Sequence, residues 1–310
     1  MWVRQYGPAI LKNRRCDLQA YCSGLIAAGH ARLPDTDTQP TLSFQGSREE
    51  HLRLLQISED VIRELIKHPS VQDIGEPMLM HPDLHKRNIY VSADDATQIT
   101  ALIDWQSTSI DPVFWHATEQ PDFTTGPPEI ENVLEGEDGL TVYTDEERQK
   151  IMRDVSICRQ TYEVVMQGYA RTLYQARTTD ERLLRVILYC ATSWKDSATA
   201  LTAELIDLSD HWTDVGLSGS CPYRPTSAER DEHKRRLEDF ETSQKLRSFL
   251  MQLTHANSEG WIPTSAWDDT QAAQKLAFDD WMNTVTGPDA EDGLTEEKAR
   301  ALWPFDLVDR

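Results

Sequence analysis

The residues best suited to chemistry lie between His81 and Asp104. Asp83 is followed five positions later by Asn88, on a short loop between two apolar runs, and Asp104 comes sixteen positions after Asn88. Two carboxylates and an amide oxygen are hard ligands of the kind that Mg²⁺ takes together with phosphate groups. Alternatively, one carboxylate can orient an attacking hydroxyl group, which leaves Asn88 and the other aspartate to hold the metal.

Short strands must position these residues. Apolar runs at 78–80, 89–91 and 99–103 have the length and composition of strands, and the last two flank Ser92 to Gln98 as in a β-hairpin. Because Asn88 precedes one hairpin strand and Asp104 ends the other, we expect them to lie side by side.

The rest of the chain has apolar residues at helical spacing. Helices are predicted over 9–30, 47–68, 145–176, 180–208, 226–256, 268–284 and 295–303. Ser47 and Glu50 have the spacing of a capping box, residues 117–144 are expected to be a loop, and Trp212 to Pro225 a Gly/Ser/Pro linker. The predicted fold class is therefore α+β and mostly helical, with a small β unit embedded in helices.

The polar loop, from His81 to Asn88, and the hairpin together resemble a known family. His81, Asp83 and Asn88 match the H-x-D-x-x-x-x-N catalytic loop of kinases, and Asp104 matches the metal-binding aspartate that follows it. The longer strings HPDLHKRNIYV and ITALIDWQ resemble the signature of aminoglycoside phosphotransferases in the protein-kinase-like superfamily. IDWQSTSIDP, which includes Asp111, looks closest to the fungal group named altered inheritance of mitochondria protein 9. The resemblance in motifs covers roughly residues 70–130.

The resemblance implies a role for each residue of the motif. Asp83 would be the catalytic base, with His81 bracing the loop and His85 positioning the loop or the phosphates. Asn88 and Asp104 would bind the cofactors, which are Mg²⁺ and ATP. The implied reaction is phosphoryl transfer to a hydroxyl group of a small-molecule substrate.

The resemblance also implies the organisation of the chain. Residues 1–285 would form the C-terminal lobe of a protein-kinase-like fold, with the hairpin carrying the catalytic and metal-binding loops, and residues 286–310 a tail with a short helix. No G-x-G-x-x-G and no lysine-bearing strand precedes His81, so the N-terminal lobe is expected to be missing.

A missing lobe would impair catalysis. Each lost charge-assisted contact to phosphate is worth roughly 1.5–3 kcal/mol, so three such losses weaken nucleotide binding about a thousandfold or more. The alternative is a non-catalytic pseudokinase or scaffold in mitochondrial maintenance, with a protein partner that covers the exposed cleft.

Composition narrows the partners and the compartment. The net charge is −21, from 52 acidic and 31 basic residues, which argues against nucleic acid and anionic lipid as partners. The five cysteines, at positions 16, 22, 158, 190 and 221, are scattered, as expected for free thiols inside a cell. No apolar run reaches the ~18 residues that insertion into a membrane requires.

The name of the fungal group implies a mitochondrial location. The composition by itself would indicate the cytoplasm. The basic stretch over residues 1–15 is interpreted as folded protein rather than a presequence.

One rival chemistry uses the same loop. His81, Asp83 and His85 alternate along the chain and could form a metal trio for hydrolysis on one strand face, although Pro82 disfavours a regular strand there. The other histidines occur singly and are expected to be surface or core residues: 30, 51, 68, 116, 211, 233 and 255.

Overall fold

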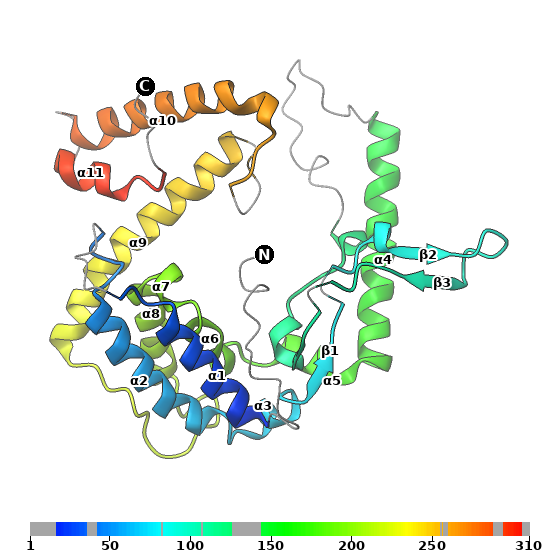
Figure 1. The fold of residues 1–310 in the computed structure, drawn as a ribbon, viewed down its shortest axis with the longest axis horizontal. Helices are drawn as coiled ribbons and strands as arrows, with labels where there is room; N and C mark the ends of the chain where they lie inside the picture. The colour runs from blue at the N-terminus through cyan, green and yellow to red at the C-terminus, as the bar shows by residue number, and fades with distance from the viewer. Residues whose placement is uncertain are drawn as a thin grey trace. The chain divides into compact units, whose positions relative to one another are not determined.

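The computed structural model is mostly helical, with two small antiparallel sheets, which confirms the α+β expectation (Figure 1). It describes residues 17–35, 42–81, 83–106, 108–125, 144–254, 256, 260–287 and 294–305. The predicted start of the first helix, the basic N-terminal stretch and most of the loop over 117–144 lie outside these residues. The chain divides into two compact units, the first made of residues up to Gly24 and Arg63–Leu184, the second of Leu25–Ile62 and Arg185 onward.

The first unit carries both sheets. Strand β1 (Pro77–Leu79) pairs antiparallel with β4 (Ile110–Pro112), and β2 (Ile89–Val91) pairs antiparallel with β3 (Ile99–Leu102). The predicted hairpin is therefore confirmed, and its turn is closed by the Ser92 amide, which donates to the Gln98 carbonyl at 2.9 Å. The sequence did not predict β4, a three-residue strand that ends in a proline.

Short helices surround these strands in the first unit. They are α3 (Pro69–Asp73) and the 3-10 helices η3 (Lys86–Asn88), η4 (Val113–His116) and η5 (Asp122–Thr124). Two longer helices follow, α4 (Asp145–Tyr169) and α5 (Arg171–Thr178), where one helix was predicted. The break lies at Ala170, whose φ of −122° and ψ of 52° are outside the helical region.

Two helices pass from one unit into the other near the start of the chain. They are α1 (Leu18–Ala31) and α2 (Arg48–Leu65). The amide of Glu50 donates to Ser47 Oγ at 3.1 Å, which is half of the predicted capping box. The other half is replaced, because the Glu50 carboxylate instead accepts from Arg236 Nη1 at 2.9 Å.

The second unit is helical. Where one helix over 180–208 was predicted, there are three, α6 (Arg182–Cys190), which starts in the first unit, α7 (Ser193–Asp196) and α8 (Ala198–Asp210). Ser197 interrupts them with a φ of 93° and caps α8 by accepting from the Ala200 amide. The Ala198 amide, at the start of α8, donates to the Gln45 carbonyl at 2.9 Å, so a tertiary contact fixes where this helix begins.

The C-terminal helices of this unit are α9 (Ser227–Leu253), α10 (Trp267–Thr286) and α11 (Glu296–Leu302). Leu250, Phe278 and Trp303 form a small core among them. The predicted linker before α9 is confirmed, since neither helix nor strand lies between Asp210 and Ser227, but it is packed: Trp212 and Tyr223 are buried and the Trp212 indole donates to the Ser218 carbonyl at 3.1 Å.

Two sequence-based expectations about the whole chain can be compared with the described residues. Cys22, Cys158, Cys190 and Cys221 are free thiols. Among the described helices, none combines the length and apolar character that a membrane span requires.

Candidate active site

The hairpin brings the two halves of the predicted site together. Asn88 immediately precedes β2, and Asp104 follows β3 after Ile103. The register pairs Ile89 with Leu102, and the Ile103 amide donates to the Asn88 carbonyl at 3.1 Å. Asn88 and Asp104 therefore lie at the same end of the hairpin.

His81 links the polar loop to that end of the hairpin. Its Nδ1 accepts from the Asp83 amide at 3.2 Å, so the ring proton is on Nε2, which donates to the Ile103 carbonyl at 2.7 Å. The ring also packs edge-on against Trp105, with centroids 4.6 Å apart. His81 thus holds the residue before Asp104 against the loop that carries Asp83.

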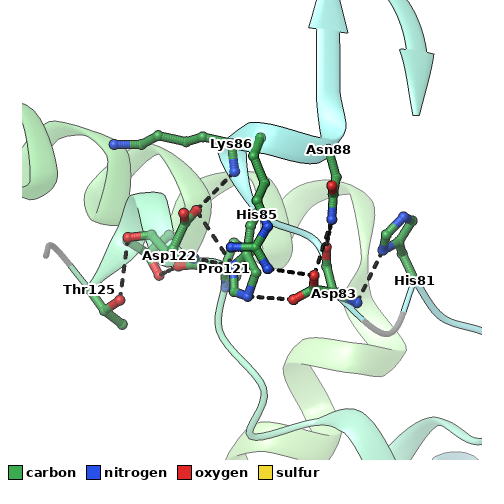
Figure 2. Close-up of polar contacts among 10 residues, drawn as sticks. His81, Asp83, His85, Lys86, Asn88, Pro121, Asp122 and Thr125 are labelled. Carbon is green, nitrogen blue, oxygen red and sulfur yellow. Dashed lines mark hydrogen bonds and ion pairs between the residues drawn. The ribbon is translucent and has the colours of Figure 1, made fainter. Parts of the chain in front are cut away.

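Three neighbouring side chains hold the Asp83 carboxylate, as Figure 2 shows in part. Its Oδ1 accepts from His85 Nε2 at 2.7 Å. Its Oδ2 accepts from Arg87 Nη2 at 2.7 Å and from Asn88 Nδ2 at 3.2 Å. A carboxylate fixed in this way has one orientation, as is required of a group that aligns an attacking hydroxyl.

Asn88 and Asp104 suit a hard cation. Asn88 is 4% exposed, and its Nδ2 donates to the Asp83 carbonyl at 2.8 Å as well as to the carboxylate. Since the amide nitrogen is committed, Oδ1 is the atom available as a ligand. Asp104 has a φ of 67°, in the left-handed region that aspartate tolerates better than most residues, and its carboxylate has no hydrogen bond or ion pair with any other residue that the structure describes. The donor set of one carboxylate and one amide oxygen fits Mg²⁺ bound with phosphates.

The rival metal trio is not found. Among the described residues, no group of three or more His, Cys, Asp or Glu side chains is placed to hold a metal ion. Instead, His81 Nε2 bonds to a backbone carbonyl and His85 Nε2 bonds to Asp83. Pro82 lies outside the described residues.

Asp122 and Arg87 were not predicted as site residues. Asp122 faces His85, whose Nδ1 lies 3.3 Å from the Asp122 amide nitrogen and 3.6 Å from Asp122 Oδ1 (Figure 2). Asp122 Oδ1 also accepts from the Lys86 amide at 3.0 Å. The spacing of Asp83 and Arg87, four positions apart, could have suggested their ion pair. Asp122 lies 37 positions beyond His85 in a stretch that was predicted to be a loop, and no pattern marks it.

A second polar cluster is buried beside the strands. Asp111, on β4, accepts hydrogen bonds from the Tyr21 hydroxyl at 3.1 Å, from the Ser109 hydroxyl and from His116 Nε2 at 3.1 Å. His116 Nδ1 lies 3.2 Å from Glu119 Oε1. His116 is therefore not an isolated core residue, as the sequence suggested, but half of a buried ion pair.

Burial and hydrogen bonding compete in this cluster. Burial by itself would raise the pKa of Asp111, but the hydrogen bonds from His116, Ser109 and Tyr21, together with the imidazolium charge, hold this pKa below its usual value. Burial would lower the pKa of His116, but the hydrogen bonds and charges of Asp111 and Glu119 raise it to about 9. Both groups are therefore charged at neutral pH.

The comparisons with known proteins concern the same part of the chain. No curated protein and no solved structure matches the sequence. Residues 18–115 match the family model described as the phosphotransferase enzyme family, and this range includes both the polar loop and Asp104. Residues 18–115 thus match a domain of the aminoglycoside-phosphotransferase type, which supports kinase-like phosphotransferase ancestry.

Proposed function

We propose that this protein transfers a phosphoryl group from ATP to a hydroxyl group of a small molecule. The observation that carries the proposal is the Asp83 carboxylate, which three side chains hold beside the free oxygen of Asn88. Phosphoryl transfer depends on positioning and on charge stabilisation more than on covalent intermediates, so a small set of fixed polar groups is enough.

Each site residue has its own role in the proposed reaction. Asp83 aligns the substrate hydroxyl and accepts its proton, while His85 and Arg87 keep the carboxylate in place. Asn88 and Asp104 would hold Mg²⁺, which supplies charge neutralisation at the phosphates when bound. His81 sets the distance between the two loops by bonding to Ile103.

The finer parts of the proposal rest on the resemblance. We take residues 1–285 as a kinase-like C-terminal lobe and 286–310 as its tail, with the fungal altered inheritance of mitochondria protein 9 group as relatives and mitochondria as the location. Residues 1–80 contain no glycine-rich phosphate loop, so we expect this chain by itself to bind nucleotide weakly.

A second candidate is a non-catalytic scaffold that binds a protein partner. It is favoured by the hairpin, where large apolar side chains are 37–60% exposed: Tyr90, Val91, Ile99, Leu102, Ile103 and Trp105. A two-stranded hairpin is only marginally stable alone, and exposed apolar surface of this kind commonly marks an interaction site. The partner would cover these side chains.

Calorimetry with Mg²⁺·ATP tests the first candidate. We expect binding that Asp104→Ala removes and that Asp94→Ala, at an exposed aspartate in the hairpin turn, leaves intact. Asp83→Asn should keep nucleotide binding and abolish product formation, because it removes the proton acceptor and leaves Asp104 in place.

The opposite results would favour the scaffold. If ATP at millimolar concentration does not bind, or if Asp104→Ala binds as well as wild type, the enzyme proposal fails. In that case Ile99→Lys on the hairpin should abolish association with the partner, whereas Asp83→Asn should leave association unchanged.

A further inference from the structure

We propose that Asp122 is a positioning residue that acts through His85 on the Asp83 carboxylate. The inference rests on the proposed function, since it concerns the same site. Asp122 contributes through its backbone amide and its Oδ1 acceptor rather than through its charge.

The two contacts of Asp122 fix two consecutive residues of the polar loop. The Asp122 amide donates to His85 Nδ1 at 3.3 Å, and Asp122 Oδ1 accepts from the Lys86 amide at 3.0 Å. A ring nitrogen that accepts a hydrogen bond carries no proton, so the proton of neutral His85 must be on Nε2. Nε2 then donates to Asp83 Oδ1 at 2.7 Å. The tautomer that Asp122 selects is the one that holds Asp83.

Asp122 is itself anchored to a long helix. It begins η5, in which Thr124 is buried and donates its hydroxyl proton to the Pro121 carbonyl at 2.7 Å. The Thr124 carbonyl accepts from Arg159 Nε, on α4, at 3.0 Å. Hydrogen bonds, joined by the short backbone of η5, therefore connect α4 through Asp122 and His85 to Asp83, all within the first unit.

The charge of Asp122 contributes little to this arrangement. Its side chain is 42% exposed, and its Oδ1 lies 3.6 Å from His85 Nδ1, beyond the usual range of a strong ion pair. Exposed ion pairs contribute little to stability. An asparagine at position 122 keeps both the amide and the Oδ1 acceptor, so it should substitute for the aspartate.

Three substitutions separate the two contacts. Asp122→Asn removes only the charge, Asp122→Ala also removes the acceptor for the Lys86 amide, and Asp122→Pro removes the backbone donor as well. Proline is compatible with this position, because it is the first residue of a 3-10 helix and the preceding Pro121 is already extended, with a φ of −64° and a ψ of 146°.

The primary measurement is the His85 imidazole signal in ¹⁵N-edited NMR spectra, assigned with His85→Gln. We expect wild type and Asp122→Asn to show a slowly exchanging Nε2 proton and an unprotonated Nδ1. Asp122→Pro should speed the exchange of that proton about tenfold. The reason is that the loss of about one hydrogen bond corresponds to about a tenfold change in an equilibrium constant. Asp122→Ala, with the amide donor intact, should give an intermediate result. Unchanged melting temperatures would show that the variants fold.

Turnover gives the second readout. In the Pro variant we expect kcat to fall about tenfold while KM for ATP stays within about twofold, because Asp122 touches neither ATP-binding residue. If the Pro variant keeps the wild-type His85 signal, the positioning role is refuted. If wild type shows the expected His85 signal but no turnover, the proposed function fails and the positioning role of Asp122 stands.

Discussion

The buried ion pair between Asp111 and His116 makes stability depend on pH in a window above neutrality. His116 changes from a usual pKa of 6.5 to about 9 on folding. One pKa unit corresponds to about 1.36 kcal/mol, so the protonated imidazole contributes about 3 kcal/mol to the free energy of unfolding. Because the folded value lies above the unfolded one, this contribution is complete below about pH 6.5 and is lost as the pH rises through about 9.

Two measurements check this magnitude against a His116→Gln variant. An NMR titration should show one histidine ring resonance with a midpoint near pH 9, absent from the variant. Chemical denaturation at pH values from about 6 to 10 measures the free energy of unfolding. Over this range it should fall about 3 kcal/mol more in wild type than in the variant, because glutamine has no proton to lose. A midpoint below pH 7, or the same pH dependence in both proteins, would refute the ion pair.

Two further predictions concern stability and are measured by urea denaturation. Gly29→Ala should destabilise by about 1–3 kcal/mol, because its Cβ would collide with the Cys190 carbonyl oxygen and lie 2.9 Å from Leu55 Cδ2. The matched substitution Gly168→Ala, with no atom within 4 Å of the new methyl group, should instead stabilise α4 by about 0.5–1 kcal/mol. If both substitutions change stability in the same direction, the close contacts at Gly29 do not determine its effect. Thr226→Ala should lower the free energy of unfolding by about 1 kcal/mol, because it removes the capping box of α9. Thr226→Ser keeps the capping hydroxyl and should retain the wild-type stability. An equal loss of stability in both variants would show that the capping hydroxyl is not its cause.

The sequence predicted those elements whose determinants are local. The hairpin follows from two apolar runs around Ser92 to Gln98, and the helices α9, α10 and α11 follow from apolar spacing, and these predictions were correct. Some helix ends depend on distant partners. The start of α8 is set by the Gln45 carbonyl, and Glu50 leaves its capping box for Arg236, neither of which a local pattern contains.

The same distinction applies to the candidate site. Its motif residues were recognisable because His81, Asp83 and Asn88 are close in the sequence and Asp104 follows within one hairpin. Asp122 contacts the loop through a backbone amide and through Oδ1, at residues 36 and 37 positions away, so no local pattern marks it. The pairing of Asp111 with His116 was equally hidden, because burial determines it and each residue is unremarkable alone.

The way in which Asp83 is held also limits what can approach it. A carboxylate offers about four lone-pair positions, and the donors of His85, Arg87 and Asn88 occupy three. One position is left, on Oδ1, which is enough for a single hydroxyl donor and too little for a group that binds a carboxylate through two parallel donors, such as a guanidinium. The hydrogen bonds within the loop thereby leave Asp83 able to accept from one further donor rather than from two.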